Sequence, residues 1–363
     1  MNNIAFFSGD ITRNGGTERV TTLIANELQK NEKYNISIIS LTERNDDIYF
    51  NLDKSIPHYK LYDKVVSGLF HFMGYTKRLK NIIRENNIDL LIDIDGIIDM
   101  YSVPIRKKTG VKIISWEHFN VYHHPNPWLR KVVRKYAVPR VDAIVTLTEE
   151  DKGYYEKEFN IKCPIQSIYN PVIWKQETHE YDINSKILLS AGRLTNQKGF
   201  DISIEVAKNV MTKNPDWKWI ILGEGEDRQL LEKKIQEYGL VEQVLLPGNK
   251  NNIEDYYMKS SMFVMTSRYE GLPMTLLETK PYKLPIVSFK CKTGPSELVR
   301  DGINGYLIKE NDIEGMSTKI NELINDSNKR IDFSENALLD TEKFKLDSII
   351  KQWETLIDKI VND

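Results

Sequence analysis

The chain has 363 residues, enough for two domains of ordinary size, and its 40% hydrophobic and 28% charged residues are typical of a globular protein. The formal net charge of -2 argues against a general nucleic-acid binder, because such proteins carry a basic excess. The two cysteines, Cys163 and Cys291, form no C-x-x-C pair, so we expect no disulfide framework or zinc site, and they suit a reducing compartment.

The first residues, MNNIAFFSGD, lack the basic and long apolar regions of a signal peptide. No run of about 18 uncharged apolar residues occurs, so we expect a cytoplasmic protein without a membrane-spanning helix. Short β-branched apolar runs alternate with amphipathic segments, which predicts doubly wound α/β domains with parallel sheets. The ten predicted strands cover residues 3–8, 34–41, 88–95, 111–115, 141–147, 185–191, 217–223, 242–247, 262–267 and 285–289.

The series of strands is interrupted over 165–184, a polar stretch without clear periodicity that we interpret as a linker. We therefore predict an N-terminal Rossmann-like domain over 1–170 and a C-terminal one over 171–345. The last segment, 346–363, is predicted to be an amphipathic helix, because its apolar residues follow helical spacing. These residues are Ile349, Ile350, Trp353, Leu356, Ile357 and Ile360.

The first candidate binding loop is SGDITRNGGTERV (8–20), where a predicted strand leads through Gly15 and Gly16 into a helix. Paired glycines let a backbone approach a ligand closely, and the N-terminus of a helix attracts anions. A strand-to-helix turn that only needs flexible residues is the alternative.

Two segments of the first domain, 65–80 and 127–140, combine apolar, aromatic and basic residues. Segments of this kind dock on anionic membrane surfaces, so both are candidates for peripheral contact with the inner face of the cell membrane. Ordinary helices packed on the first sheet are the alternative. Helical spacing in 127–140 predicts one face with Leu129, Val132, Val133 and Tyr136 and an opposite face with Arg130, Lys131, Arg134 and Lys135.

Two further motifs follow strands of the first domain. DIDG (93–96) has the D-x-D spacing of a divalent-metal site, but we interpret its carboxylates as closing a buried strand and expect no metal. In SWEHFN (115–120), His118 is predicted to lie at the carboxyl end of the strand 111–115. A histidine there can hydrogen-bond a sugar hydroxyl or stabilise charge at a reacting centre, and a structural histidine is the alternative.

In the second domain, SAGRLTNQKGFD (190–201) places Arg193 and Lys198 beyond the end of a strand. Two cations at this position suit a diphosphate, although solvated loop cations are the alternative. The following motif, ILGEGEDRQLLE, lacks the third glycine of a dinucleotide fingerprint, because Arg228 occupies that place. We interpret Gly223 and Gly225 as marking a tight strand-to-helix turn near a nucleotide.

The stretch SRYEGLPMTLLE (267–278) contains two carboxylates eight positions apart. Glu270 precedes a helix predicted to start at Pro273, and Glu278 lies within that helix. Carboxylates accept hydrogen bonds from sugar hydroxyls, and the helix N-terminus between them suits a phosphate. The spacing fits a nucleotide sugar with ribose at one end and the transferred sugar at the other; two solvated charges are the alternative.

Together these motifs resemble, nearly end to end, the retaining family 4 glycosyltransferases of GT-B fold. GGTER resembles their glycine loop, GRLTNQKGFD their "GR…KG" signature, EGLPMTLLE their E-x7-E motif, and TGPSELVRDGINGYLI (293–308) the glycine-rich segment that follows. The resemblance implies two Rossmann-like domains facing a central cleft, with the helix 346–363 crossing back to the N-terminal domain.

The resemblance also implies roles for individual residues in a reaction that needs no metal. Arg193 and Lys198 would hold the donor diphosphate, and Glu278 would bind the ribose. Glu270 would bind the transferred sugar, and His118 would lie beside its reacting centre. The catalytic residues implied are thus Glu270, His118, Arg193 and Lys198. The residues implied in donor binding are Gly15, Gly16, Arg193, Lys198, Glu270, Gly271, Leu272, Pro273, Thr275 and Glu278.

Among family members the pattern looks most like bacterial enzymes of capsule, exopolysaccharide or lipopolysaccharide biosynthesis. We therefore expect transfer of a hexose or N-acetylhexosamine, with retention of configuration, from a UDP-sugar to a hydroxyl of a lipid-linked glycan. Within ETKPYKLP, Pro281 departs from the family pattern and is expected to distort its helix. The alternatives are a catalytically silent GT-B subunit that binds glycan or stabilises a partner transferase, a sugar-nucleotide epimerase of the same fold, and a dinucleotide-dependent oxidoreductase.

Overall fold

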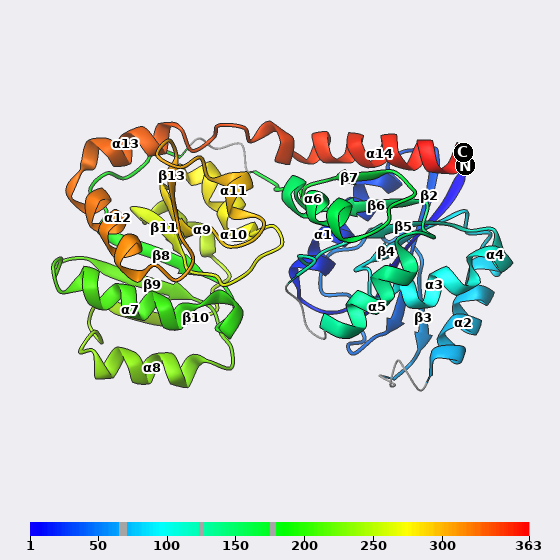
Figure 1. Ribbon diagram of the computed structural model, residues 1–363, viewed down its shortest axis with the longest axis horizontal. Helices are drawn as coiled ribbons and strands as arrows, with labels where there is room; N and C mark the ends of the chain where they lie inside the picture. The colour runs from blue at the N-terminus through cyan, green and yellow to red at the C-terminus, as the bar shows by residue number, and fades with distance from the viewer. Residues whose placement is uncertain (65–70, 123–126, 175–178, 363) are drawn as a thin grey trace. The chain divides into compact units, whose positions relative to one another are not determined.

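The computed structural model describes residues 1–64, 71–122, 127–174 and 179–362. The chain divides into two compact units, the first formed by Met1–Pro171 with Lys343–Asp363 and the second by Val172–Glu342 (Figure 1). Each unit contains one sheet in which every strand pair is parallel. The doubly wound α/β class predicted from the apolar runs is confirmed.

The first unit has a seven-stranded sheet in the order β3-β2-β1-β4-β5-β6-β7. Its strands are β1 (Asn2–Ser8), β2 (Tyr34–Thr42), β3 (His58–Tyr62), β4 (Leu90–Ile94), β5 (Lys112–Trp116), β6 (Ala143–Thr146) and β7 (Ile165–Ser167). Its helices are α1 (Gly16–Gln29), α2 (Phe72–Glu85), α3 (Asp99–Ser102), η1 (Val103–Ile105), α4 (Arg106–Thr109), α5 (Pro127–Ala137), α6 (Glu149–Glu158) and α14 (Leu346–Asn362).

The inner strands of this sheet are those that the sequence predicts most clearly. In β1, Ile4, Ala5, Phe6 and Phe7 are all 0% exposed, because helices cover both faces of a central parallel strand. The edge strands β3 and β7 were not predicted. They are short and less apolar, because a strand at the edge has one unpaired side and less buried surface.

The interpretation of 165–184 as a linker is therefore wrong over β7, which pairs with β6. Residues 175–178 of that stretch lie outside the described residues. Beyond them the chain already belongs to the second unit, because the Tyr181 hydroxyl donates a hydrogen bond of 2.6 Å to the carbonyl oxygen of Ser261.

The last helix, α14, returns to the first unit after the chain has completed the second. Its predicted apolar stripe is buried there, apart from the half-buried Ile350. Trp353 packs edge-on against Trp116 at the end of β5, with ring centroids 4.9 Å apart. The Tyr34 hydroxyl donates a hydrogen bond of 2.7 Å to Asp358. Burial, followed by this contact, raises the pKa of Tyr34.

The second unit has a six-stranded sheet in the order β10-β9-β8-β11-β12-β13. The edge strand β13 was not predicted as a strand, because its glycine-rich surroundings obscure a short apolar run. The strands are β8 (Ile187–Ala191), β9 (Lys218–Leu222), β10 (Val244–Gly248), β11 (Met262–Met265), β12 (Ile286–Phe289) and β13 (Gly305–Ile308). The helices are η2 (Asn196–Lys198), α7 (Phe200–Met211), α8 (Arg228–Glu237), α9 (Ile253–Met258), α10 (Met274–Thr279), η3 (Lys280–Tyr282), α11 (Pro295–Leu298), α12 (Ile313–Asn325) and α13 (Ser327–Glu335), and η4 (Glu342–Phe344) leads to α14.

Candidate functional site

The carboxyl ends of β8 and β11, neighbours in the second sheet, bring Lys198 and Glu270 together. Lys198 ends the short helix η2 that follows β8, and Glu270 lies in the loop that follows β11. The Nζ atom of Lys198 donates a hydrogen bond of 2.7 Å to Oε1 of Glu270. The side chains are 19% and 6% exposed, so a cation and a carboxylate form a mostly buried pair at the edge where open α/β sheets bind ligands.

Two glycines let the loops around this pair approach each other closely. Gly199 has a φ of 64°, and a Cβ on it would lie 2.2 Å from the carbonyl oxygen of Thr266. Gly294 has a φ of 91°, and its Cβ would lie 2.4 Å from Cδ of Pro273. Beside it, the Thr293 hydroxyl donates a hydrogen bond of 2.6 Å to the carbonyl oxygen of Glu270. The "KG" and "TGP" stretches thus hold the loop that carries Glu270.

Arg193, the other predicted cation, follows β8 and is exposed. Its neighbour Leu194 is buried, and the backbone N–H of Leu194 donates a hydrogen bond of 2.9 Å to the carbonyl oxygen of Glu224. Cβ atoms on Gly223 and Gly225 would lie 1.9 Å and 2.2 Å from carbonyl oxygens of this loop. The two glycines therefore let adjacent loops pack closely. This packing anchors the backbone beside Arg193, while the Arg193 side chain remains accessible to an anion.

The second predicted carboxylate, Glu278, lies in α10 and is half-buried. The Tyr257 hydroxyl of α9 donates a hydrogen bond of 3.2 Å to its Oε2. Tyr257 is 1% exposed and stacks on Tyr282, with ring centroids 5.2 Å apart. The sequence analysis did not find Tyr257, because the contact joins positions 21 apart on two different helices and no motif marks it.

The helix α10 corrects one prediction and confirms another. Pro273 is not its first helical residue but its N-cap, and the helix begins at Met274. It stops at Thr279 and continues as η3, so Pro281 interrupts it as expected. Since α10 has only six residues, its dipole is small, and side-chain cations are the stronger partners for an anion here. The predicted contacts Leu272 and Pro273 are buried, whereas Gly271 and Thr275 are half-exposed.

In the first unit, Gly15 is the N-cap of α1 and Gly16 its first residue. The carboxylate of Glu18 folds back over this loop, since a Cβ on Gly15 would lie 2.3 Å from its Oε2. Nε of Arg13 donates a hydrogen bond of 2.9 Å to the other oxygen of Glu18. An internal carboxylate therefore already lies at the N-terminus of α1, and the loop suits a hydroxyl group better than a phosphate.

His118 follows β5 and is 8% exposed. Its ring lies against Trp116, with centroids 4.3 Å apart, and burial lowers its pKa to about 3, with the charge of Glu117 opposing the shift. Among the described residues, Nε2 of His118 has no hydrogen-bond partner. A neutral imidazole with an unsatisfied nitrogen can accept from or donate to a hydroxyl, and a role beside a sugar stays a prediction.

The carboxylates at the ends of β4 and β5 make hydrogen bonds inside the unit. Glu117 accepts hydrogen bonds of 3.1 Å and 2.8 Å from Nε and Nη2 of Arg134, and Asp95 pairs with Arg130. Asp93 accepts from the hydroxyl of Ser102, while burial raises its pKa to about 7. Both carboxylates of the D-x-D motif thus bond to protein groups, in keeping with their interpretation as the closure of a buried strand.

These ion pairs correct the predicted faces of the segment 127–140. Arg130 and Arg134 do not share an outward face with the lysines, because they are 8% and 1% exposed and pair with Asp95 and Glu117. Val132 and Tyr136, predicted on the apolar face, are 47% and 40% exposed. The need to pair Glu117 and Asp95 outweighs the apolar periodicity, because an unpaired buried carboxylate is costlier than an exposed valine.

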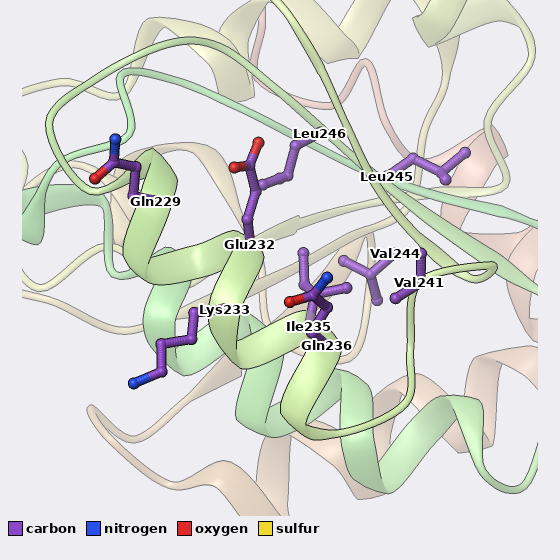
Figure 2. Close-up of a pocket in the computed structure, with 9 residues that line it drawn as sticks. All are labelled: Gln229, Glu232, Lys233, Ile235, Gln236, Val241, Val244, Leu245 and Leu246. Carbon is purple, nitrogen blue, oxygen red and sulfur yellow. The ribbon is translucent and has the colours of Figure 1, made fainter.

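A groove of about 520 Å³ lies elsewhere on the second unit, between α8 and the edge strand β10. Figure 2 shows its lining side chains, which come from residues 229–236 and 241–246 and include none of the predicted site residues. Within the described ranges, no three His, Cys, Asp or Glu residues gather in a way that could hold a metal ion. No helix in the same ranges is long and apolar enough to cross a membrane.

Comparison with known proteins identifies the family to which the chain belongs. The family model described as "Glycosyltransferase Family 4" matches residues 14–173, and "Glycosyl transferases group 1" matches residues 175–339. An uncharacterized glycosyltransferase of Haemophilus influenzae is 32% identical over 98% of this chain and 100% of its own. The chain belongs to the family 4 glycosyltransferases of GT-B fold.

Other relatives have more specific names. The amylovoran biosynthesis glycosyltransferase AmsD of Erwinia amylovora is 29% identical over 96% of this chain and 97% of its own. An α-1,4-N-acetyl-D-galactosaminyltransferase of Campylobacter jejuni, named for an undecaprenol-linked substrate, is 27% identical over 96% of both chains. The chain is thus a glycosyltransferase of the exopolysaccharide and lipopolysaccharide biosynthesis type.

Solved structures show the same fold. The apo lipopolysaccharide outer core galactosyltransferase WaaB matches with a TM-score of 0.78 and 22% identity, over 98% of this chain and 99% of its own. Anabaena HepE, solved in complex with UDP, matches with a TM-score of 0.80 and 16% identity, over 99% of this chain and 100% of its own. At these identities the likeness concerns the fold alone.

Proposed function

We propose that this enzyme moves a hexose or N-acetylhexosamine from a UDP-sugar to a hydroxyl of a lipid-linked glycan, with retention of configuration and without a metal. The observation that carries the proposal is the pair of Lys198 and Glu270 at the carboxyl edge of the second sheet, with the exposed Arg193 nearby in sequence. The UDP complex of HepE and the name of the Campylobacter relative support the donor and the lipid-linked acceptor.

Each residue of the second unit has a distinct task in this proposal. Arg193 and Lys198 bind the diphosphate and stabilise the charge that develops on it, which is the contribution that a metal makes in other transferases. Glu278, held by Tyr257, accepts hydrogen bonds from the ribose. Glu270 accepts from hydroxyls of the transferred sugar, while its pairing with Lys198 keeps a carboxylate next to a phosphate-binding cation.

The residues of the first unit serve the acceptor and the reacting sugar. The glycine loop at Gly15 and Gly16 contacts hydroxyl groups, because Glu18 opposes an anion there. His118, neutral at physiological pH because burial lowers its pKa to about 3, hydrogen-bonds a sugar hydroxyl and does not supply a positive charge. The backbone of Gly271, Leu272, Pro273 and Thr275 completes the donor contacts.

The proposed reaction is a front-face displacement. The bond between the anomeric carbon and the diphosphate oxygen breaks, and the acceptor hydroxyl forms its bond on the same face of an oxocarbenium-like sugar. The proton of the acceptor passes to the departing diphosphate, so UDP and the extended glycan are the products. Arg193 and Lys198 lower the barrier by neutralising the leaving group.

The test is substitution of Glu270. Glu270→Ala should abolish transfer, because the sugar is no longer oriented, while UDP binds with an affinity within about threefold of the wild type. Transfer is followed with radiolabelled UDP-sugars, and UDP affinity by calorimetry. Full activity in Glu270→Ala would refute the assignment.

The nucleotide and the stereochemistry need their own measurements. At a hundredfold excess over the dissociation constant, binding stabilises a protein by about 2.7 kcal/mol, so UDP should raise the melting temperature more than GDP or ADP. A response to GDP alone would overturn the choice of donor. NMR of the product should show the anomeric configuration of the donor, and chelation with EDTA should leave the rate unchanged.

A further inference from the structure

The outward face of α5 carries aromatic, aliphatic and basic side chains together. Trp128, Val132 and Tyr136 are 76%, 47% and 40% exposed, and Lys131 and Lys135 are exposed between them. These positions recur at intervals of three and four residues, which places them on one side of a helix. The helix contains no acidic residue, so this face is both apolar and positively charged.

The opposite face holds α5 firmly on the first unit. Val133 and Ala137 are buried in the unit, and Arg130 and Arg134 form the ion pairs with Asp95 and Glu117 described above. The exposed face is therefore not the outside of a loosely attached helix, but a surface kept in a fixed orientation by two buried ion pairs. It would keep that orientation when it binds a partner.

Positive charge continues beyond the end of the helix. Arg140 is exposed and lies over the ring of Tyr136, with Cζ 4.5 Å from the ring centroid, and its Nη1 donates a hydrogen bond of 2.6 Å to the carbonyl oxygen of Tyr136. Three cations thus surround two large aromatic side chains on one surface, which we call the α5 face: Trp128, Lys131, Val132, Lys135, Tyr136 and Arg140.

We propose that the α5 face docks on the surface of an anionic lipid bilayer. Tryptophan and tyrosine favour the boundary between headgroups and acyl chains, and the lysines and Arg140 complement anionic headgroups. The inference rests on the proposed function, because a lipid-linked acceptor requires the enzyme to work at a bilayer surface.

The other membrane candidate, 65–80, does not extend this surface in the described residues. Residues 65–70 lie outside them. In α2, Tyr75 and Leu79 are buried in the core of the unit, and the exposed Met73 and Lys77 are not accompanied by an exposed aromatic side chain of the same helix. The docking surface is therefore assigned to the α5 face alone.

The same helix links the docking surface to the predicted site. Arg134, on its inner side, holds Glu117 next to His118 and donates a hydrogen bond of 3.2 Å from Nη1 to the carbonyl oxygen of Val121. The segment that carries His118 is thus fixed to the helix that lies on the bilayer. Docking through α5 therefore presents this segment at a defined orientation to an acceptor whose lipid is anchored in the same bilayer.

The experiment measures binding of the full chain to vesicles of phosphatidylcholine, with and without phosphatidylglycerol, by cosedimentation. Each lysine near an anionic surface contributes about fivefold to partitioning, so Lys131→Gln with Lys135→Gln should weaken binding to anionic vesicles roughly 30-fold. Trp128→Ser should weaken vesicle binding also at high salt, because salt screens the charges of the lysines but leaves the apolar contribution of Trp128 in place. The matched control is Lys213→Gln with Lys233→Gln, which removes two exposed charges from the second unit.

If the α5 double variant binds anionic vesicles as well as the control, the proposal is wrong. Failure of docking is separable from failure of the enzymatic proposal. A wild type that transfers sugar to a water-soluble acceptor analogue but ignores vesicles refutes only the docking. A wild type that binds vesicles through α5 but transfers nothing refutes only the enzymatic proposal. Unchanged melting temperatures verify that the variants are folded.

Discussion

The two units use charged residues at the carboxyl ends of their strands in opposite ways. In the first unit the charges pair with one another inside the protein, as in Arg134 with Glu117, both nearly inaccessible to solvent. In the second unit Arg193 is exposed, and Lys198 keeps a fifth of its side-chain surface accessible. Similar strand orders thus support an edge with a buried ion pair in one unit and an edge with accessible cations in the other.

The difference shows that the edge of a parallel sheet is not in itself a binding site. The second unit differs because an anion from solvent can reach Arg193 and the accessible part of Lys198. Its glycines let the loops pack closely, because no side chain lies between them. In the first unit, Glu18 and Glu117 instead accept hydrogen bonds from Arg13 and Arg134 of the same unit. The comparison can be tested by removing charges from each edge and measuring stability and transfer separately.

The largest expected effect is on the stability of the first unit. Arg134→Ala leaves Glu117 buried without its guanidinium and should lower the free energy of unfolding by about 3–5 kcal/mol, measured by chemical denaturation. Arg193→Ala is the matched control: it removes an exposed arginine and should change stability by less than about 0.5 kcal/mol, yet reduce transfer. Equal destabilisation by the two variants would contradict the distinction between the edges.

Lys198→Ala should strongly reduce transfer. Loss of one charge that stabilises the leaving diphosphate costs on the order of 10²–10³ in kcat. Steady-state kinetics measures this effect. The control is Lys213→Ala, which removes an exposed lysine outside the loops that carry Lys198 and Glu270 and should leave the enzyme fully active. If Lys198→Ala keeps wild-type kcat, the diphosphate does not bind at this cation.

The buried acids of the first unit predict an unusual pH dependence of stability. Because burial raises the pKa of Asp93 to about 7 from an ordinary value near 3.8, the folded state binds more protons than the unfolded state between about pH 4 and pH 7. The contribution of Asp93 to the free energy of unfolding is therefore fully present below pH 4 and is lost as the pH rises through 7.

Asp93→Asn should consequently stabilise the protein at pH 8 by about 2 kcal/mol and have little effect at pH 4. Denaturation curves at both pH values give the comparison with the wild type. The exposed Asp216, on the second unit, offers the control Asp216→Asn, whose effect should not follow this pattern because its pKa is lowered. A stabilisation by Asp93→Asn that is the same at both pH values would contradict the prediction.

The smallest effect concerns the ribose. Tyr257→Phe removes the hydroxyl that orients Glu278 and should cost about 1 kcal/mol of UDP affinity, roughly fivefold. If the Tyr257 hydroxyl promotes UDP binding by orienting Glu278 towards the ribose hydroxyls, the preference for UDP over 2′-deoxy-UDP should shrink in this variant. Tyr282→Phe, which keeps the stacked ring, should retain the wild-type preference. Equal losses for both nucleotides in Tyr257→Phe would show a merely structural role.

The sequence predicted the inner strands because a strand buried on both faces must be almost continuously apolar, as in Phe6 and Phe7 of β1. It did not predict β3 and β7, because these edge strands are short and less apolar, or β13, because glycine-rich surroundings obscure its short apolar run. The glycine loop, the "GR…KG" and the E-x7-E motifs were recognisable because their residue types and spacing are local. Tyr257 and Thr293 were missed as partners of Glu278 and Glu270, since these contacts join separate loops and helices.

The sequence by itself determined the class of fold and supplied the candidate site residues, because apolar periodicity and glycine spacing act over a few neighbouring residues. Only the tertiary structure decided which charges remain available. The sequence predicts an outward face for Arg134 in the helical segment 127–140 and a loop position for Arg193, yet Arg134 is buried against Glu117 and Arg193 is exposed. The physical reason is that the energy of a charge depends on the solvent and counter-charges around it, which are set by contacts far apart along the chain.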